Sequence, residues 1–147
     1  MVKNISIKEI MTREVITVSP TDNMTVVDEI FKKNNIHHVP VIDKNGKVVG
    51  LISSTDYNKL QNTFTFFIND KSEAYNKAIM RSLLVEDVMT KHIATLQNDS
   101  TVMVAAGIFN ENLFHAIPVV DKQGKLEGIV TTFDLLNYAY NKQLTLP

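Results

Sequence analysis

One short motif that pairs a hydroxyl with a carboxylate at fixed spacing occurs twice in the chain. Its form is Gly-h-h-Ser/Thr-x-x-Asp, with h apolar, and the copies end in Asp56 and Asp134. A carboxylate at a helix N-terminus can accept both hydroxyls of a ribose, and nearby hydroxyl and N–H groups can hold the rest of a nucleotide. On spacing alone a structural interpretation is favoured, because Ser53 or Thr131 followed by an acid approaches a capping box. The two interpretations are compatible, since a cap can also face a cleft.

The glycine that opens each motif, Gly50 or Gly128, lies inside an apolar, strand-like pattern. A lone glycine weakens a strand and often marks the close approach of another backbone or of a ligand. We therefore expect either a backbone segment or a ligand to lie against each of these glycines.

Histidines recur at matched positions, His37 and His115, three residues before a proline, and His38 adds a third. They suit half-buried positions at a strand entrance, or contact with an anion such as phosphate. A metal site is less favoured, because the chain has no cysteine and four histidines. A catalytic histidine is also less favoured, because no G-x-S-x-G motif is present, and neither a P-loop nor G-x-G-x-x-G occurs.

These residues belong to an internal repeat. "HHVPVIDKNGKVVGLISSTD" (37–56) matches "HAIPVVDKQGKLEGIVTTFD" (115–134) at an offset of 78 residues, and the match extends without a gap from Ile10 and Val88. One supersecondary unit is therefore used twice.

Each repeat predicts the element order β-α-β-β-α. Short strands are expected at 15–18 and 93–96, and helices follow with Asp22 and Ser100 as N-caps. Buried strands are expected at 39–42 and 117–120, glycine turns next, and third strands at 47–53 and 125–131. Second helices start near the two motif aspartates. The predicted apolar helix faces are Val26, Val27, Ile30 and Phe31, and Val104, Ala105, Ile108 and Phe109.

The fold class predicted from this order is α/β (α+β). A single repeat buries too little surface to be stably folded alone. We expect the two repeats to pack sheet to sheet about a pseudo-twofold axis, with helices outside. The predicted domains are 1–61 and 84–147, and the linker 62–83 is expected to be largely helical. Its "FTFFI" segment (64–68) either packs onto the fold or forms a partner or dimer surface.

Composition limits the functional classes. The chain has 147 residues, a net charge of −1 and no cysteine. A sequence-independent nucleic-acid binder needs surplus Lys and Arg, so that class is disfavoured. No disulfide framework is expected, and no apolar run approaches a membrane span. Because the N-terminus lacks a signal-peptide pattern, we expect a cytoplasmic protein.

The doubled segment "IMTREVITV…IHHVPVIDKNGKVVGLISSTD" closely resembles the cystathionine-β-synthase (CBS) domain, which in tandem forms a Bateman module. The resemblance covers about residues 5–61 and 84–140. It implies clefts between the halves that bind adenosine-containing ligands such as AMP, ADP or ATP. It also implies a homodimer formed through helices. The chain is similar to the stand-alone kind of module.

Ligand-site residues are carried over from this resemblance. One cleft would contain Thr12, Thr17, Ile36, His37, His38, Ile129, Thr131 and Asp134. The other would contain Thr90, Thr95, Phe114, His115, Ala116, Leu51, Ser53 and Asp56. The resemblance implies that Asp binds ribose and that apolar residues flank adenine. "IHHVP" is similar to the Ile-His-Arg-Leu-Pro of adenylate-sensing members, but His38 and Ala116 stand at the arginine positions, which argues against triphosphate binding.

We therefore expect a non-catalytic regulatory module that requires no cofactor or metal, binds an adenosine ligand and signals to a partner protein. A structural dimerisation module with vestigial clefts is the alternative. An enzyme is least favoured, because the sequence offers no nucleophile–base pair and no metal cluster.

Overall fold

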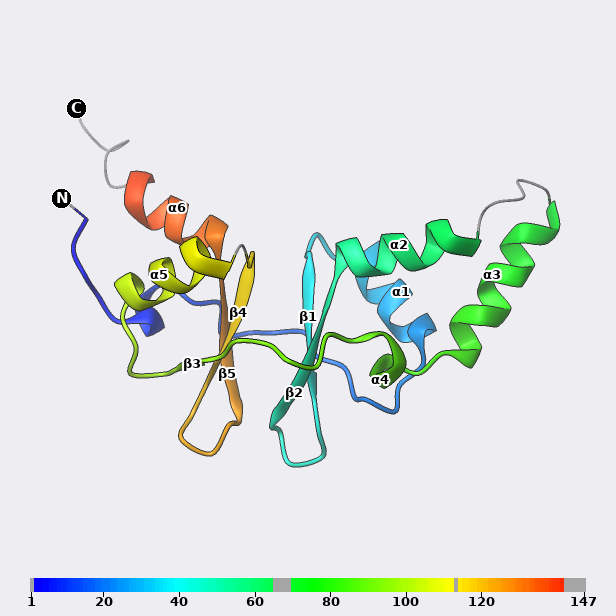
Figure 1. Ribbon diagram of the computed structural model, residues 1–147, viewed down its shortest axis with the longest axis horizontal. Coiled ribbons are helices and arrows are strands. Elements are labelled where there is room, and N and C mark those ends of the chain that lie inside the picture. Colours follow the sequence, from blue (N-terminus) through cyan, green and yellow to red (C-terminus); the bar gives the residue numbers. More distant parts are fainter. Residues whose placement is uncertain (1, 65–69, 113, 142–147) are drawn as a thin grey trace. The chain divides into compact units, whose positions relative to one another are not determined.

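The computed structural model describes residues 2–64, 70–112 and 114–141 (Figure 1). Its elements are η1 (Ile7–Glu9), α1 (Met24–Lys33), β1 (His38–Ile42), β2 (Val48–Ser53), α2 (Ser54–Phe64), α3 (Asp70–Ser82), α4 (Val85–Val88), β3 (Leu96–Gln97), α5 (Val102–Asn112), β4 (Ala116–Val120), β5 (Leu126–Thr131) and α6 (Thr132–Asn141). The mixed α/β class predicted from the sequence is confirmed. The "FTFFI" segment falls outside the residues whose side chains are described.

The chain forms two compact units, and each contains parts of both sequence repeats. One unit comprises Met1–Val15 and Ala94–Pro147, and the other comprises Ile16–Ile93. The Met-Thr segment that begins each repeat therefore packs with the hairpin of the other repeat. The predicted boundaries near residues 61 and 84 delimit the sequence repeats. The chain passes from one compact unit to the other at different points, after Val15 and after Ile93.

An antiparallel hairpin is the centre of each unit. β1 pairs with β2 and β4 pairs with β5 in matched registers, with Val41 opposite Gly50 and Val119 opposite Gly128. The turns of both hairpins use a glycine with positive φ, 81° at Gly46 and 82° at Gly124, as the sequence predicted. Both Asp motifs thus begin on the second strand of a hairpin and end in the helix that follows it.

The first strand of each repeat is shorter than predicted. Val18 makes a single parallel bridge with Val41, and β3 pairs with β4 over two residues. After Val18 the chain turns at once, because the Ser19 N–H donates to Asp22 Oδ2 at 2.8 Å. That turn ends the pairing on the C-terminal side of Val18.

Neither predicted N-cap is correct. Asn23 caps α1 by accepting from the Thr25 N–H at 3.0 Å, while Asp22 is used in the preceding turn. α5 begins at Val102, beyond Ser100. The N–H of Met103 donates to Asn4 Oδ1 at 3.1 Å. A distant segment therefore satisfies a donor that the local sequence was expected to satisfy.

The buried helix faces match the predicted ones except at the first predicted position of each helix. Val26 and Val104 are exposed, whereas Met24 and Val102, two residues earlier, are buried. The buried or packed positions of α1 are 24, 27, 30 and 31, which keep helical spacing. Three of the four predicted positions in each helix are therefore confirmed, and Val26 and Val104 are the two that were wrong.

Each unit has its own apolar core around its hairpin. Val39, Val41 and Ile52 are fully buried in one unit, and Ile117, Val119 and Val130 are fully buried at the matching positions of the other. These cores fix the strands from which the two Asp motifs emerge. Every helix in the described part of the chain is too short to span a membrane, since the longest, α3, has 13 residues.

Candidate ligand-binding site

The Met-Thr segments hold the start of both Asp motifs. In one unit Thr12 and Ile129 exchange two backbone hydrogen bonds, of 2.9 and 3.0 Å. In the other, Thr90 and Leu51 exchange bonds of 2.9 and 3.1 Å. Ile129 and Leu51 each follow the motif glycine directly. Residues taken from different repeats by the family resemblance therefore lie together inside a single unit.

Glycine is required at both motif starts by the backbone that crosses it. A Cβ added at Gly128 would lie 2.8 Å from the Thr12 carbonyl oxygen and 2.7 Å from Met11 Sδ. One added at Gly50 would lie 3.0 Å from the Thr90 carbonyl oxygen and would also collide with Met89. The sequence left two alternatives for the close neighbour of each glycine, another backbone or a ligand. In both units the neighbour is a backbone.

Asp134 and Thr131 form a reciprocal cap at the start of α6. The N–H and Oγ1 of Thr131 donate to Asp134 Oδ2 at 2.8 and 2.9 Å, and the Asp134 N–H donates to Thr131 Oγ1 at 3.2 Å. Both lone pairs of Oδ2 are thus committed, and Oδ1 accepts no bond from the described residues. The structural interpretation of this motif is correct, and one carboxylate oxygen is still available.

An open hollow of about 310 Å³ adjoins Asp134. Ile10 and three further α6 residues, Asn137, Tyr138 and Asn141, line it. The asparagines follow Asp134 by three and seven positions, so they share its helix face. Their amides can donate and accept hydrogen bonds. Neither asparagine was predicted from the sequence, although helical spacing from Asp134 points to both.

Asp56 occupies the matching position with a half-formed cap. Its N–H donates to Ser53 Oγ at 3.1 Å. Its carboxylate accepts no hydrogen bond from the described residues, and the side chain is half-buried. Both carboxylate oxygens of Asp56 are therefore available to a ligand, compared with one in Asp134.

The paired histidines lie beside the starts of the same helices. The His37 carbonyl oxygen accepts from the Ser54 N–H at 2.8 Å, and the His115 carbonyl oxygen accepts from the Thr132 N–H at 3.1 Å. Ser54 Oγ also lies 3.5 Å from His37 Nδ1. His37 and His115 are exposed, not half-buried as one interpretation had it, while His38 is half-buried. Among the described residues, no three His, Cys, Asp or Glu side chains are grouped as metal ligands.

The predicted site residues divide between the two units. Ile16–Ile93 contains Thr17, Ile36, His37, His38, Leu51, Ser53, Asp56 and Thr90. The other unit contains Thr12, Thr95, Phe114, His115, Ala116, Ile129, Thr131 and Asp134. In each unit the structure brings together the Met-Thr segment, the Asp motif and the histidine before the hairpin. Ala116 is buried in β4, so its side chain is not open to a ligand.

Comparison with known proteins decides the family. The protein-family model of the CBS domain matches residues 7–61 and 85–141, which together make up most of the chain. The chain belongs to the CBS domain family. With two domains in one chain, it is a tandem CBS pair, as the sequence predicted.

Related CBS pairs include proteins solved with adenosine ligands. An uncharacterized protein of Methanocaldococcus jannaschii is 32% identical, with 88% of each chain covered. The structure of CBSX2 in complex with AMP has a TM-score of 0.75 at 25% identity and covers 94% of this chain and 98% of that one. The CBS domain pair of protein MJ0100, in complex with 5-methylthioadenosine and S-adenosyl-L-methionine, has a TM-score of 0.75 at 26% identity and covers 95% and 99%.

Proposed function

We propose that this CBS pair is a non-catalytic regulatory module that binds an adenosine-containing ligand through Asp56 and Asp134 and signals its occupancy to a partner protein. The observation that carries the proposal is the state of the two carboxylates. Each stands in the first turn of a helix, and each keeps at least one oxygen without a partner among the described residues. Ligands in the related structures, AMP and S-adenosyl-L-methionine, share the adenosine group.

The chemistry of binding follows from these groups. A ribose cis-diol donates two hydrogen bonds, and a carboxylate is the natural acceptor for both. Asp56 can accept them on two oxygens, whereas Asp134 offers Oδ1 alone until Thr131 releases Oδ2. The exposed His37 and His115 are suited to an anionic group on the ligand. AMP, with one phosphate, is the ligand we select for testing.

A thermal-shift screen tests the proposal. AMP, ADP, ATP and S-adenosylmethionine are compared with GMP and inorganic phosphate as controls. A ligand at one hundred times its Kd adds about 2.7 kcal/mol to the unfolding free energy, which gives a clear rise in melting temperature. We expect a rise with at least one adenosine compound and none with phosphate. If none of the adenosine compounds moves the transition, the proposal is wrong.

A second candidate function, self-association, is favoured by one exposed apolar surface. Phe133, Leu136 and Tyr140 follow each other along α6 and are 67, 57 and 56% exposed. The equivalent positions of α2 are Thr55, Asn58 and Asn62. We propose that a second copy of the chain covers this α6 surface. Because the surface occurs in one repeat only, pairing with itself about a twofold axis is the arrangement that buries it in both copies.

Light scattering on a sizing column tests this pairing. Wild type should elute at about twice the 16.6 kDa chain mass, and Leu136→Asp should elute near 16.6 kDa. Asn58→Asp, the matched change on α2, should leave the dimer intact. A wild-type mass of one chain, or a Leu136→Asp protein that is still dimeric, would reject the α6 surface.

A further inference from the structure

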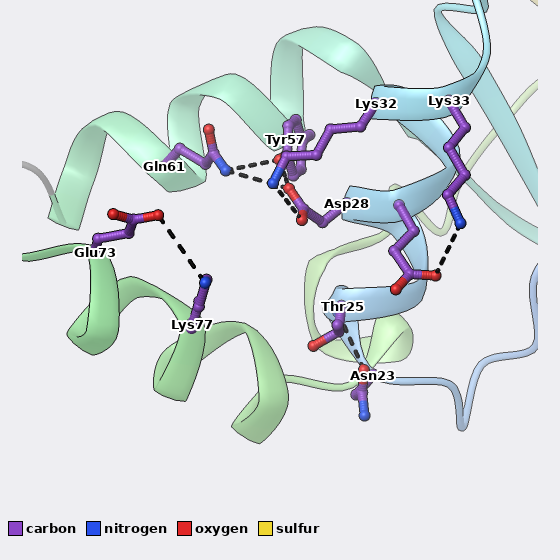
Figure 2. A network of polar contacts seen from close by, with 10 residues as sticks. Asn23, Thr25, Asp28, Lys32, Lys33, Tyr57, Gln61, Glu73 and Lys77 are labelled. Atoms are coloured by element: carbon purple, nitrogen blue, oxygen red, sulfur yellow. Dashed lines mark hydrogen bonds and ion pairs between the residues drawn. The ribbon is translucent and has the colours of Figure 1, made fainter.

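A polar network in the Ile16–Ile93 unit joins α2 to α1 (Figure 2). The hydroxyl of Tyr57 donates to Asp28 Oδ1 on α1. Gln61, one turn farther along α2, donates to the Tyr57 hydroxyl oxygen at 2.6 Å and lies 3.5 Å from Asp28 Oδ1. Lys32 Nζ binds the other oxygen, Asp28 Oδ2, at 2.8 Å. Asp28 therefore receives donors from both helices.

Tyr57 and Asp28 are largely buried, so the network favours one arrangement of its side chains. Tyr57 is 6% exposed, and its ring packs against Phe31 with centroids 5.3 Å apart. Burial, together with the hydrogen bond to Asp28 and the charge of Asp28, raises the pKa of Tyr57 above its usual range. The hydroxyl is thus a donor throughout the neutral pH range. The Asp28 side chain is 17% exposed, so loss of a donor leaves a largely buried carboxylate less well satisfied.

The other repeat has no equivalent of this network. The positions that match Asp28, Lys32, Tyr57 and Gln61 are Ala106, Asn110, Leu135 and Ala139. In that unit the Asp134 carboxylate is held directly, by the N–H and the hydroxyl of Thr131. Ser53 makes no such bond to the Asp56 carboxylate. Asp56 is instead followed immediately by the anchored Tyr57.

We propose that Tyr57 and Asp28 are positioning residues for Asp56. By fixing the first two turns of α2 on α1, they set where the Asp56 carboxylate points, as Thr131 does for Asp134. The benefit to a ligand is pre-organisation, because less freedom is lost when an already oriented group binds. This inference rests on the proposed function, in which Asp56 accepts ligand hydroxyls.

Calorimetry with AMP measures the effect one motif at a time. In an Asp134→Ala background, where Asp56 alone reports, Tyr57→Phe should weaken AMP binding about two- to tenfold. In an Asp56→Ala background the same change should alter affinity less than about twofold, because Asp134 has its own anchor. Equal AMP affinity with and without the Tyr57 hydroxyl in the first background overturns the proposal.

A rescue pair separates positioning from general stability. Asp28→Ala removes the acceptor and should weaken AMP at Asp56 as Tyr57→Phe does. Asp28→Asn keeps an acceptor oxygen for Tyr57 and should recover most of that affinity, although it loses the ion pair with Lys32. A purely structural contribution would lower the melting temperature of all three variants without changing AMP affinity, and that pattern would contradict the proposal.

Hydrogen exchange supplies a readout that needs no ligand. The Asp56 N–H is bonded to Ser53 Oγ, and the Asp134 N–H to Thr131 Oγ1. Tyr57→Phe should speed exchange at Asp56 and not at Asp134. If wild type binds none of the adenosine compounds of the thermal-shift screen while this difference appears, the proposed function is wrong and the positioning stands. If AMP binds while neither exchange nor affinity responds, the positioning is wrong and the function stands.

Discussion

Replacing Gly128 by alanine is expected to separate the Met-Thr segment from β5. The added Cβ would lie 2.8 Å from the Thr12 carbonyl oxygen, a backbone atom that is itself held by the Ile129 N–H at 3.0 Å. It would also lie 2.7 Å from Met11 Sδ. A methionine side chain can rotate away, but a hydrogen-bonded carbonyl cannot move without breaking its bonds. We therefore expect the substitution to weaken both Thr12–Ile129 hydrogen bonds.

The cost can be estimated from these two effects. Each hydrogen bond contributes about 0.5–1.5 kcal/mol net. Overpacking a tight site typically costs about 1–3 kcal/mol. We expect Gly128→Ala to lower the unfolding free energy by about 2–4 kcal/mol. For a chain of this size that corresponds to a fall in melting temperature of roughly 5–15 °C.

Thermal unfolding followed by circular dichroism is the assay, and Gly107→Ala is the matched control. Gly107 lies in α5 of the same unit, and a Cβ added there would meet nothing within 4 Å. Alanine in the helix interior should stabilise by about 0.5–1 kcal/mol. A Gly128→Ala protein that melts within about 2 °C of wild type would refute the crossing-backbone argument.

Three further predictions follow from single groups. Because the pKa of Tyr57 is raised, by burial first and then by Asp28, its contribution is present below pH about 10 and is lost as pH rises beyond that value. Urea unfolding of wild type and Tyr57→Phe should show a stability difference that is constant between pH 7 and 9 and shrinks by about pH 11; a constant difference throughout would contradict it. Gly124→Ala, at φ 82°, should cost about 1 kcal/mol, and no change in the urea midpoint would show that the turn relaxes. Thr131→Ala, which removes two side-chain bonds of the cap, should destabilise by about 1 kcal/mol and more than Ser53→Ala, and the reverse order in thermal melts would count against the difference in capping.

The hairpins were predictable because their information is local and written twice. β-branched runs on either side of a glycine turn recur at the same offset. The sequence therefore predicted β1 and β2 in the first repeat and their counterparts β4 and β5 in the second. The first buried position of each helix was less predictable. Val26 looked core-facing by period alone, yet α1 begins after Asn23 and points Met24 inward. Which residue starts a helix depends on a capping bond that several neighbouring side chains could make.

The exchange of segments between repeats could be expected only from the family resemblance, which grouped Thr12 with Ile129 and Thr90 with Leu51, because it rests on contacts between distant parts of the chain. The pairing of Thr12 with Ile129, and that of Asn4 with Met103, leave no mark in local composition. The glycine of each motif was the available clue, since it indicated a close neighbour without naming it. The difference between Asp56 and Asp134 was equally hidden, because both motifs have the same pattern and differ in the bonds their side chains form.

Calorimetry with AMP on wild type, Asp56→Ala, Asp134→Ala and the double variant tests the central claim most directly. Charge-assisted bonds to a carboxylate contribute about 1.5–3 kcal/mol, so each single variant should weaken its own site about ten- to one-hundredfold. Circular dichroism must first show that each variant is folded, because losing a cap costs about 1 kcal/mol. We predict AMP binding by wild type, one weakened site in each single variant and no strong site in the double variant. A folded double variant that binds AMP as tightly as wild type would contradict the assignment of Asp56 and Asp134.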